Sequence, residues 1–348
     1  VRRDELWKLD FQIPLKHGIK QVLGENGGPG GLSHSLRNIP IVLDIARDVE
    51  RLCPNAWLIN YSNPMSAICR AMHKASQVKT FGLCTAANFP RQIARMLGID
   101  DPERVETVVG GLNHWVWLLR LTVDGRDAYP WLRERVHAPD FNPYYRSSVE
   151  ILDAFGWWPM PGANHVAEFF PYFYGDPADT EARRRYPYQH EHDFDQAAVK
   201  QAELRQSLRR QAHGEEPLKA HAPLESASDA VRMLTSIWTG RRTRHFANIA
   251  NHGLIPNLPH EAVVEVPVIA DAMGVRGLQV GPLPQSVVGL VQARCAFFEL
   301  LADAAIHRSR ELALQCLLAD TNTTSLQAAR ACVEEMFAAQ AEFLPGFA

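Results

Sequence analysis

A cysteine and a histidine in this sequence have side chains that can bind a divalent metal ion. Cys84 follows Gly82-Leu83, and His114 follows Gly111-Leu112-Asn113. A thiolate and an imidazole can share one metal ion if the fold brings them together. A single cysteine at a strand end is more often a small buried side chain, and a single histidine beside an apolar run is more often part of the core. The sequence alone does not choose between these interpretations.

Two asparagines flank a short turn before a proline, in the order Asn60, Asn63 and Pro64. Asparagine tolerates tight turns and caps helices, which gives both residues a structural explanation. Amides at the end of a buried strand are equally well placed to bind the hydroxyl groups of a ligand. The residues support both interpretations equally.

Candidate acid–base residues lie in two other segments. Glu25 is inside the glycine-rich segment 24–31, where a carboxylate either tunes a neighbouring acid or base or faces water. His165 and Glu168 are three residues apart, a spacing that places two side chains on one face of a helix. Tyr172 follows closely, and a tyrosine acts as a base if a nearby group lowers its pKa. Taken singly, each of these residues is better explained by packing or exposure.

The elements that would position these residues alternate between strand and helix. The glycine segment predicts a loop, followed by a helix with Pro40 in its first turn. Further strands are expected at 56–59 and 78–83, and further helices at 64–75 and 90–97. Such alternation is typical of a doubly wound parallel sheet, in which ligands bind at the carboxyl ends of the strands. Asn60, Asn63 and Cys84 all lie at such ends.

The pattern changes after residue 104. A strand is predicted at 115–123, an irregular aromatic-rich segment at 139–192, helices at 195–212 and 225–239, a strand at 263–266, and two or three helices between 286 and 339. We therefore predict an α/β protein in which residues 1–104 and residues 105–348 form two parts that share one site.

Composition excludes several classes of function. The net charge of −3 gives no reason to expect nucleic acid or an anionic membrane as a partner. No apolar stretch approaches the roughly 18 residues that span a bilayer. The six cysteines form no CxxC pair, which favours a reducing, cytoplasmic location. The sequence contains no GxGxxG, no P-loop lysine and no GxSxG nucleophile motif.

Nine short motifs occur in an order that resembles family 4 of the glycoside hydrolases. They are Leu9-Asp-Phe-Gln-Ile-Pro-Leu-Lys-His-Gly18, Gly28-Pro-Gly-Gly31 with Leu36-Arg-Asn-Ile-Pro40, Asn60-Tyr-Ser-Asn-Pro-Met65, Gly82-Leu-Cys84, Gly111-Leu-Asn-His114, His165-Val-Ala-Glu-Phe169, Asn251-His-Gly-Leu-Ile-Pro-Asn-Leu-Pro259, Val264-Glu-Val-Pro267 and Val280-Gly-Pro-Leu-Pro284. Each motif is weak alone, but their joint order covers nearly the whole chain.

The resemblance implies a fold and a mechanism. The fold would be the remainder of a Rossmann-like NAD-binding domain, followed by an α+β domain of the lactate/malate dehydrogenase C-terminal type. The mechanism would differ from that of the two-carboxylate glycosidases. NAD would oxidise the sugar at C3, a base would remove the acidified C2 proton, the glycosidic oxygen would leave by elimination, and water would add. A divalent metal, usually manganese, would polarise the C2 and C3 oxygens.

The resemblance also assigns the metal and substrate residues. Cys84 and His114 would be the metal ligands, since both occupy the family's metal-binding positions. Asn63 would bind the sugar, and Asn60 and Asn113 are further substrate-binding candidates because they lie in the same motifs.

The cofactor and catalytic residues follow from the same motifs. Asn60 and Pro64 are the candidates for NAD binding in this chain. Glu25 matches an acidic position that raises the basicity of a catalytic tyrosine in related members. The catalytic base is expected from the segment 156–174, with His165 and Tyr172 as candidates.

Three features depart from the family pattern. Thr85 stands where the family often has a histidine or aspartate that donates a proton, and Ala163 stands where an aspartate often precedes the motif histidine. The strand, glycine turn and helix that cradle the NAD pyrophosphate, a unit of at least ~30 residues, are not found. We therefore expect an N-terminally truncated sequence that neither holds NAD tightly nor turns over by itself.

Two other classes of function compete with this interpretation. An NAD-linked 2-hydroxy-acid dehydrogenase would share the fold but would not need the Cys84/His114 metal pair. A non-catalytic sugar-binding relative would fit Thr85 and Ala163. Neither the sugar nor the preferred anomer is fixed, although the segment from Gly82 to Asn88 resembles the branches that act on non-phosphorylated sugars. The family resemblance further implies a small-molecule glycoside substrate and a homodimer or homotetramer.

Overall fold

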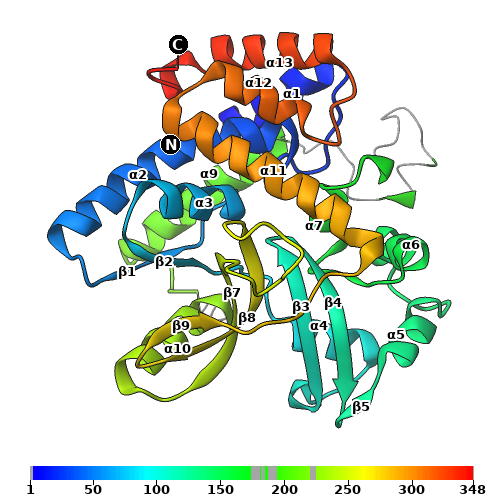
Figure 1. The fold of residues 1–348 in the computed structure, drawn as a ribbon. Helices are drawn as coiled ribbons and strands as arrows, with labels where there is room; N and C mark the ends of the chain where they lie inside the picture. The colour runs from blue at the N-terminus through cyan, green and yellow to red at the C-terminus, as the bar shows by residue number, and fades with distance from the viewer. Residues whose placement is uncertain (1–2, 174–180, 182–184, 187–193, 220–224, 348) are drawn as a thin grey trace.

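The computed structural model describes every residue except 1–2, 174–180, 182–184, 187–193, 220–224 and 348 (Figure 1). Its strands are β1 (Trp57–Asn60), β2 (Lys79–Gly82), β3 (Val105–Leu112), β4 (Trp115–Val123), β5 (Arg126–Asp127), β6 (Pro159–Met160), β7 (Thr243–Ala250), β8 (Val263–Asp271) and β9 (Gly274–Gly277). They form one sheet in the order β1-β2-β7-β8-β3-β4-β5, with β6 beside β4 and β9 beside β8.

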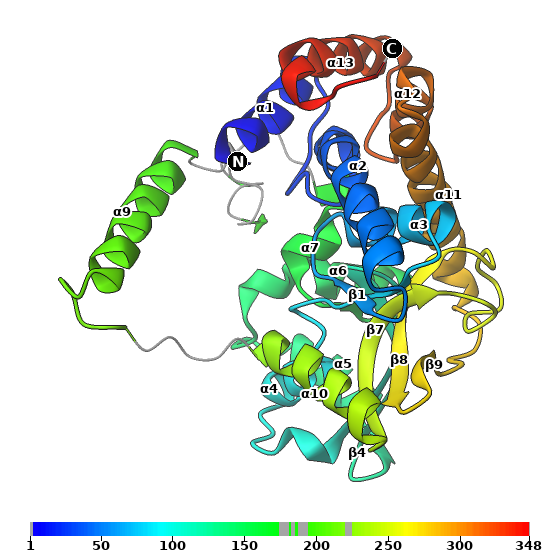
Figure 2. The same cartoon turned by 90° about the vertical axis from the view of Figure 1, so that its left-hand side faces the viewer.

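Most helices lie beside this sheet or stacked beyond one end of it, and α9 lies apart from it (Figures 1 and 2). They are α1 (Arg3–Lys16), α2 (Gly28–Leu52), α3 (Met65–Ala75), α4 (Phe89–Leu97), α5 (Tyr129–Val136), α6 (Arg146–Phe155), α7 (Ala163–Ala167), α9 (Phe194–Ala212), α10 (Glu225–Thr239), α11 (Gln285–His307), α12 (Arg310–Leu318) and α13 (Leu326–Ala339). Short 3-10 turns are η1 (Pro102–Arg104), η2 (Pro143–Tyr145), η3 (Pro171–Phe173) and η4 (Ala341–Phe343). No helix within the described residues is long and apolar enough to cross a membrane.

The sheet combines a parallel pair with an antiparallel continuation. Strands β1 and β2 are parallel, and the neighbouring pairs from β2–β7 to β4–β5 are antiparallel. The strand–helix alternation predicted for residues 56–97 is confirmed by β1, α3, β2 and α4. The sheet is therefore an α/β arrangement in which β7, from much later in the chain, adjoins β2.

Two apolar cores hold the helices on the sheet. The larger core joins α2, α3 and the three C-terminal helices to the sheet and includes Trp115 and Trp117. The smaller core lies between β3, β4 and helices α4 and α5, and it includes Trp158. All three indoles are almost completely buried. These cores fix the strand ends from which the polar side chains described below project.

The glycine-rich segment differs from the loop predicted for residues 24–31. Helix α2 begins at Gly28, and Pro40, expected in its first turn, lies inside the helix. The preceding loop packs closely against this first turn. A Cβ atom on Gly30 would come within 2.5 Å of the Gly24 carbonyl oxygen, and one on Gly31 within 2.7 Å of Asn26. These glycines therefore serve a close backbone approach as well as the turn itself.

Candidate active site

Polar side chains from four neighbouring strands meet at one edge of the sheet. Cys84 follows the end of β2, and Asn248 of β7 lies opposite Gly82. Glu265 of β8 pairs with Asn248 on one side and with Gly111 on the other. The strand order therefore brings the turn that follows Gly111 to the same edge as Cys84.

His114 occupies a strained turn at this edge. The hairpin between β3 and β4 closes with Leu112 opposite Trp115, so that Asn113 and His114 form its two-residue turn. His114 has a φ of 62°, in the left-handed region that most residues avoid, and its side chain is buried. Backbone strain of this kind persists where the surroundings enforce it, and it is concentrated at functional sites.

Three metal-binding side chains converge around His114. The His165 ring lies 4.1 Å from the His114 ring, centroid to centroid, and a Glu25 carboxylate oxygen lies 3.9 Å from the His114 Nδ1. The candidate ligand atoms of Glu25, His114 and His165 all lie within 4.8 Å of one another. The structure therefore brings together three of the residues predicted from distant parts of the sequence.

Burial keeps both imidazoles neutral. It lowers the pKa of His114 well below its usual value, and the nearby His165 lowers it further. Burial also lowers the pKa of His165, although the Glu25 carboxylate opposes this change. Neutral imidazole is the form that ligates metal ions. The Nδ1 atom of His165 has no hydrogen-bond partner among the described residues, so a lone pair or proton there is available to a ligand.

The Glu168 carboxylate holds the loop that carries Glu25. Its Oε1 atom accepts hydrogen bonds from the backbone N–H groups of Glu25 at 2.5 Å, Asn26 at 2.6 Å and Gly27 at 3.1 Å. Burial, reinforced by the Glu25 charge, raises the pKa of Glu168 to about 7. These three hydrogen bonds give Glu168 a structural role, which accounts for the burial of its charged side chain. Glu168 therefore positions the site rather than sharing proton transfer with His165.

Replacing Glu168 with alanine should destabilise the protein by about 2–4 kcal/mol, because three buried N–H groups would lose their acceptor. Glu168→Gln retains an acceptor oxygen and should cost much less. Urea unfolding of the two variants measures the difference. Equal stabilities for the alanine and glutamine variants would contradict the role given to these hydrogen bonds.

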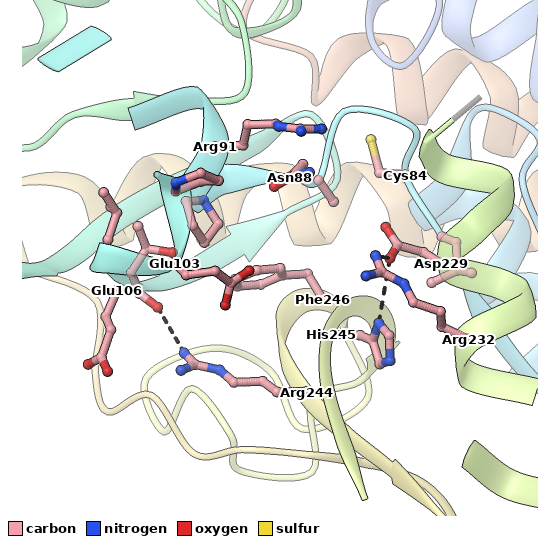
Figure 3. A pocket seen from close by; sticks show the side chains of 16 residues that line it. Cys84, Asn88, Arg91, Glu103, Glu106, Asp229, Arg232, Arg244, His245 and Phe246 are labelled. Atoms are coloured by element: carbon pink, nitrogen blue, oxygen red, sulfur yellow. Dashed lines mark hydrogen bonds and ion pairs between the residues drawn. The ribbon is translucent and has the colours of Figure 1, made fainter. Parts of the chain in front are cut away.

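Cys84 lies beside the cluster and lines a cavity of about 530 Å³ (Figure 3). Burial raises the pKa of its thiol, with the Glu265 carboxylate as the next cause, and a hydrogen bond involving Asn113 opposes this rise. Without a cation the sulfur is therefore protonated. A bound divalent metal would reverse this, because a coordinating thiol loses its proton.

Asp229 of α10 lines the same cavity, on the same side as Cys84 (Figure 3). Its carboxylate contacts Arg232, and it lies 3.7 Å from the Nδ1 atom of His245 on β7. Burial raises the pKa of Asp229, but hydrogen bonds from His245 and Arg232 outweigh burial and lower it overall. Burial raises the pKa of Tyr61, and the nearby Asp229 carboxylate and Cys84 thiol raise it further. The cavity thus offers an ionised carboxylate on the same side as the thiol.

Glu265 is a buried carboxyl group at the centre of this edge. It accepts a hydrogen bond from the Asn113 amide at 3.3 Å, and its other oxygen has no partner among the described residues. Burial raises the pKa of Glu265 to about 8, and the hydrogen bond from Asn113 is the largest effect that opposes this rise. The carboxyl group is therefore largely protonated at neutral pH and fixes the turn that carries His114.

The raised pKa of Glu265 predicts a pH dependence of stability. Its folded pKa of about 8 exceeds its ordinary value of 4.5, so ionisation favours the unfolded state. The free energy of unfolding of the metal-free protein should fall as pH rises from about 4.5 to 8 and then level off. Glu265→Gln should flatten this fall, whereas Glu134→Gln, at an exposed position, should not. Chemical unfolding at several pH values provides the test, and an unchanged slope in Glu265→Gln would contradict it.

Comparison with known proteins decides the family. The family 4 glycosyl hydrolase model matches residues 3–99, and the model of the family 4 C-terminal domain matches residues 109–323. The chain belongs to glycosyl hydrolase family 4. It is a glycosidase by family, which confirms the resemblance and decides against the 2-hydroxy-acid dehydrogenase alternative.

Two curated relatives and one solved structure are similar over nearly the whole chain. An α-galactosidase of Bacillus subtilis is 30% identical, over 97% of this chain and 78% of that protein. An α-glucosidase of Erwinia rhapontici is 34% identical, over 98% of this chain and 80% of that protein. A 6-phospho-β-glucosidase of Thermotoga maritima, solved with manganese, NAD⁺ and glucose-6-phosphate, is 25% identical with a TM-score of 0.79, covering 98% of this chain and 78% of that one.

The asparagine motif of this family 4 chain lies at the carboxyl end of β1. The Asn60 side chain is engaged locally, accepting from the Ser62 N–H and donating to the Ser62 carbonyl, each at 3.0 Å. The buried Asn63 Oδ1 atom has no partner among the described residues and is open to a ligand. Pro64 precedes the first residue of α3. Of the three candidates, Asn63 therefore has the amide oxygen best placed for a ligand group.

The remaining candidates lie in different surroundings. Tyr172, in the turn η3, is 65% exposed, and its ring packs near Phe170 and Phe173. It is not among the described residues that line the cavity or form the cluster around His114. Thr85 is exposed beside Cys84, and Ala163 is buried at the start of α7. The two residues that depart from the family pattern are therefore close in sequence to candidate site residues, Thr85 to Cys84 and Ala163 to His165.

Glu265, Asp229 and His245 were missed by the sequence analysis. Glu265 had a usable signal, because a charged residue inside the apolar run 263–268 must have a partner or a function. Asp229 and His245 had none, since α10 and the unpredicted strand β7 bring them to Cys84 from far along the chain.

Proposed function

We propose that this family 4 enzyme cleaves O-glycosidic bonds by oxidation at C3, elimination across C1–C2 and addition of water, with NAD and a divalent metal such as manganese. The observation that carries the proposal is the cluster of Glu25, His114 and His165. Cys84 lies near it, outside the cluster itself, and lines a cavity that is also lined by the ionised carboxylate of Asp229. Two-carboxylate hydrolysis would not require neutral imidazoles and a buried thiol in this arrangement.

The donor set fits a divalent metal ion. His114 and His165 are neutral, Glu25 supplies a carboxylate, and Cys84 supplies a sulfur that loses its proton on coordination. We propose Cys84 and His114 as ligands, with His165 and Glu25 completing or adjoining the site. When bound, the metal would polarise the C2 and C3 oxygens of the sugar.

We place the nicotinamide end of NAD and the sugar at the carboxyl ends of the parallel strands β1 and β2. The unpartnered Asn63 Oδ1 can accept a hydrogen bond from an amide or hydroxyl group there. We propose that Asn63 and Asn113 bind the substrate, and that Asn60 and Pro64 shape the turn against which the cofactor lies. NAD, when bound, would oxidise C3 and later reduce it again.

We propose Asp229 as the group that accepts the C2 proton. It is ionised, lines the same cavity as Cys84, and is held by His245 and Arg232. His165 remains the alternative, because its neutral Nδ1 atom is unpartnered in the cluster. Tyr172 would need to move to reach this cavity. Glu25 would then stabilise the metal site and raise the basicity of His165.

The same arguments support several broader proposals. Residues 1–104 and 105–348 would form two domains that share the site, since Cys84 comes from the first and Asp229 from the second. The substrate would be a non-phosphorylated glycoside, as for the relatives named α-galactosidase and α-glucosidase. All six cysteines are free thiols, which supports a reducing, cytoplasmic location. A homodimer or homotetramer would follow the family's usual assembly.

Cofactor dependence tests the proposal. The protein, expressed from its complete reading frame, is assayed on a panel of nitrophenyl glycosides with neither addition, with NAD alone, with Mn²⁺ alone and with both. We expect turnover only with both additions, and the panel then identifies the sugar. Turnover after chelation and removal of nucleotide would contradict the mechanism.

A further inference from the structure

A second cluster of metal-binding side chains lies in the loop between β7 and β8. It consists of His252, His260 and Glu261, whose candidate ligand atoms all lie within 4.8 Å of one another. Strand β7 begins at the cavity, which His245 lines, and runs away from it to this loop, which spans residues 251–262. None of its three residues lines that cavity or belongs to the cluster around His114, so this is a separate group of side chains.

The geometry points to a surface site for Zn²⁺ or a similar transition-metal ion, and we propose that His252, His260 and Glu261 form it. The Nδ1 atoms of the two histidines are 3.3 Å apart, and Glu261 Oε1 is 2.9 Å from His260 Nδ1. A tetrahedral zinc ion with bonds of about 2.0–2.1 Å holds neighbouring ligand atoms about 3.3 Å apart. The spacing is thus close to the edge of a zinc coordination tetrahedron.

Hydrogen bonding alone leaves this cluster incompletely satisfied. Neutral His260 can donate only one proton from Nδ1, yet both a carboxylate oxygen and a second imidazole nitrogen face that atom. A metal ion would satisfy all three lone pairs at once. Two imidazoles with one carboxylate favour zinc, copper or nickel over the manganese, magnesium and calcium that prefer oxygen ligands.

The loop is held in the shape that this site requires. The His252 N–H donates to the His260 carbonyl at 2.9 Å, which keeps the two histidines opposite each other. The Asn251 side chain donates to the carbonyls of Ile255, Leu258 and Pro259 and accepts from the Ile255 N–H. His252 has a φ of 41°, a left-handed conformation that this network enforces. Metal binding would therefore require little rearrangement.

The neighbouring charges permit a cation. Arg70 lies 3.8 Å from Glu261 Oε2, which leaves Oε1 facing His260, and its guanidinium is also paired with Glu299 at 3.1 Å. His260 and Glu261 are exposed, which leaves the remaining coordination position to water.

Zinc stoichiometry tests this site separately from catalysis. The metal-free protein is titrated with Zn²⁺ against a chromophoric chelator, and the same titration is run on the double variant His252→Gln/His260→Gln. We expect the double variant to bind one zinc ion fewer per chain while its Mn²⁺-dependent activity is unchanged. Glu261→Gln should retain the ion with at least about 10-fold weaker affinity, because one charged ligand is lost.

His137→Gln is the matched control. His137 is exposed and lies 3.1 Å from an Asp153 carboxylate oxygen, so it offers an imidazole beside a carboxylate without a second histidine. This variant should bind as much zinc as the original protein. Equal zinc stoichiometry and affinity in the original protein and in the folded double variant, checked by circular dichroism, would overturn the proposal.

Discussion

Replacing His114 with asparagine should lower kcat/KM on the order of 10³-fold, because the substitution removes a proposed metal ligand from the reacting centre. Asparagine tolerates the left-handed region better than most residues, so the turn with its φ of 62° should persist. The apparent affinity for Mn²⁺ should fall at least about 100-fold, which electron paramagnetic resonance of free Mn²⁺ measures directly.

Stability and a matched variant separate loss of the ligand from loss of the fold. The unfolding temperature of His114→Asn in the absence of metal should stay within a few degrees of the original, because neither residue is charged there and the turn is kept. His137→Asn, at an exposed position, should change neither kcat/KM nor Mn²⁺ affinity. Full Mn²⁺ affinity in a folded His114→Asn protein would remove His114 from the metal site.

Replacing Asp229 with asparagine should lower kcat by about 10²–10⁴-fold, the range expected when a positioned proton acceptor is lost. The variant is nearly isosteric and keeps a hydrogen-bonding side chain beside His245 and Arg232. KM should change much less than kcat, because Asp229 acts on the proton and not on binding. Exchange of the C2 hydrogen with solvent should be lost in parallel.

The pH profile adds a second readout for Asp229. Its lowered pKa keeps the carboxylate ionised through neutral and weakly acidic pH, so loss of activity from its protonation should begin only below the ordinary range of aspartate. Asp229→Glu should recover part of kcat, and His165→Gln should retain C2 exchange. Exchange that survives in Asp229→Asn and disappears in His165→Gln would transfer the role to His165.

The elements β1, α3, β2 and α4 were predictable because each is indicated by a pattern within a few neighbouring residues. The apolar run that became β1 and the stripes of α3 and α4 are readable over a few residues, and the polar residues after such strands lie where parallel sheets place ligands. Cys84 and His114 were selected as candidate metal ligands from motifs, and that role remains a prediction. That they lie at one edge depends on the strand order, which local patterns do not contain.

Strands β3 and β7 were not predicted, and their composition explains why. Strand β3 ends in two glycines, Gly110 and Gly111, which weaken a strand pattern. Strand β7 contains Arg244, His245 and Asn248, since it carries polar groups into the site instead of an apolar face. Two of the residues that obscured this strand, Arg244 and His245, line the cavity.

The central claim is that cleavage proceeds through removal of the C2 proton, and product analysis in D₂O tests it most directly. The protein, with NAD and Mn²⁺, is given a cleavable glycoside in D₂O, and the released sugar is examined by proton NMR and mass spectrometry. The proposed mechanism predicts deuterium at C2 of the released sugar. Released sugar with hydrogen fully retained at C2 would contradict elimination and would require direct displacement at C1 instead.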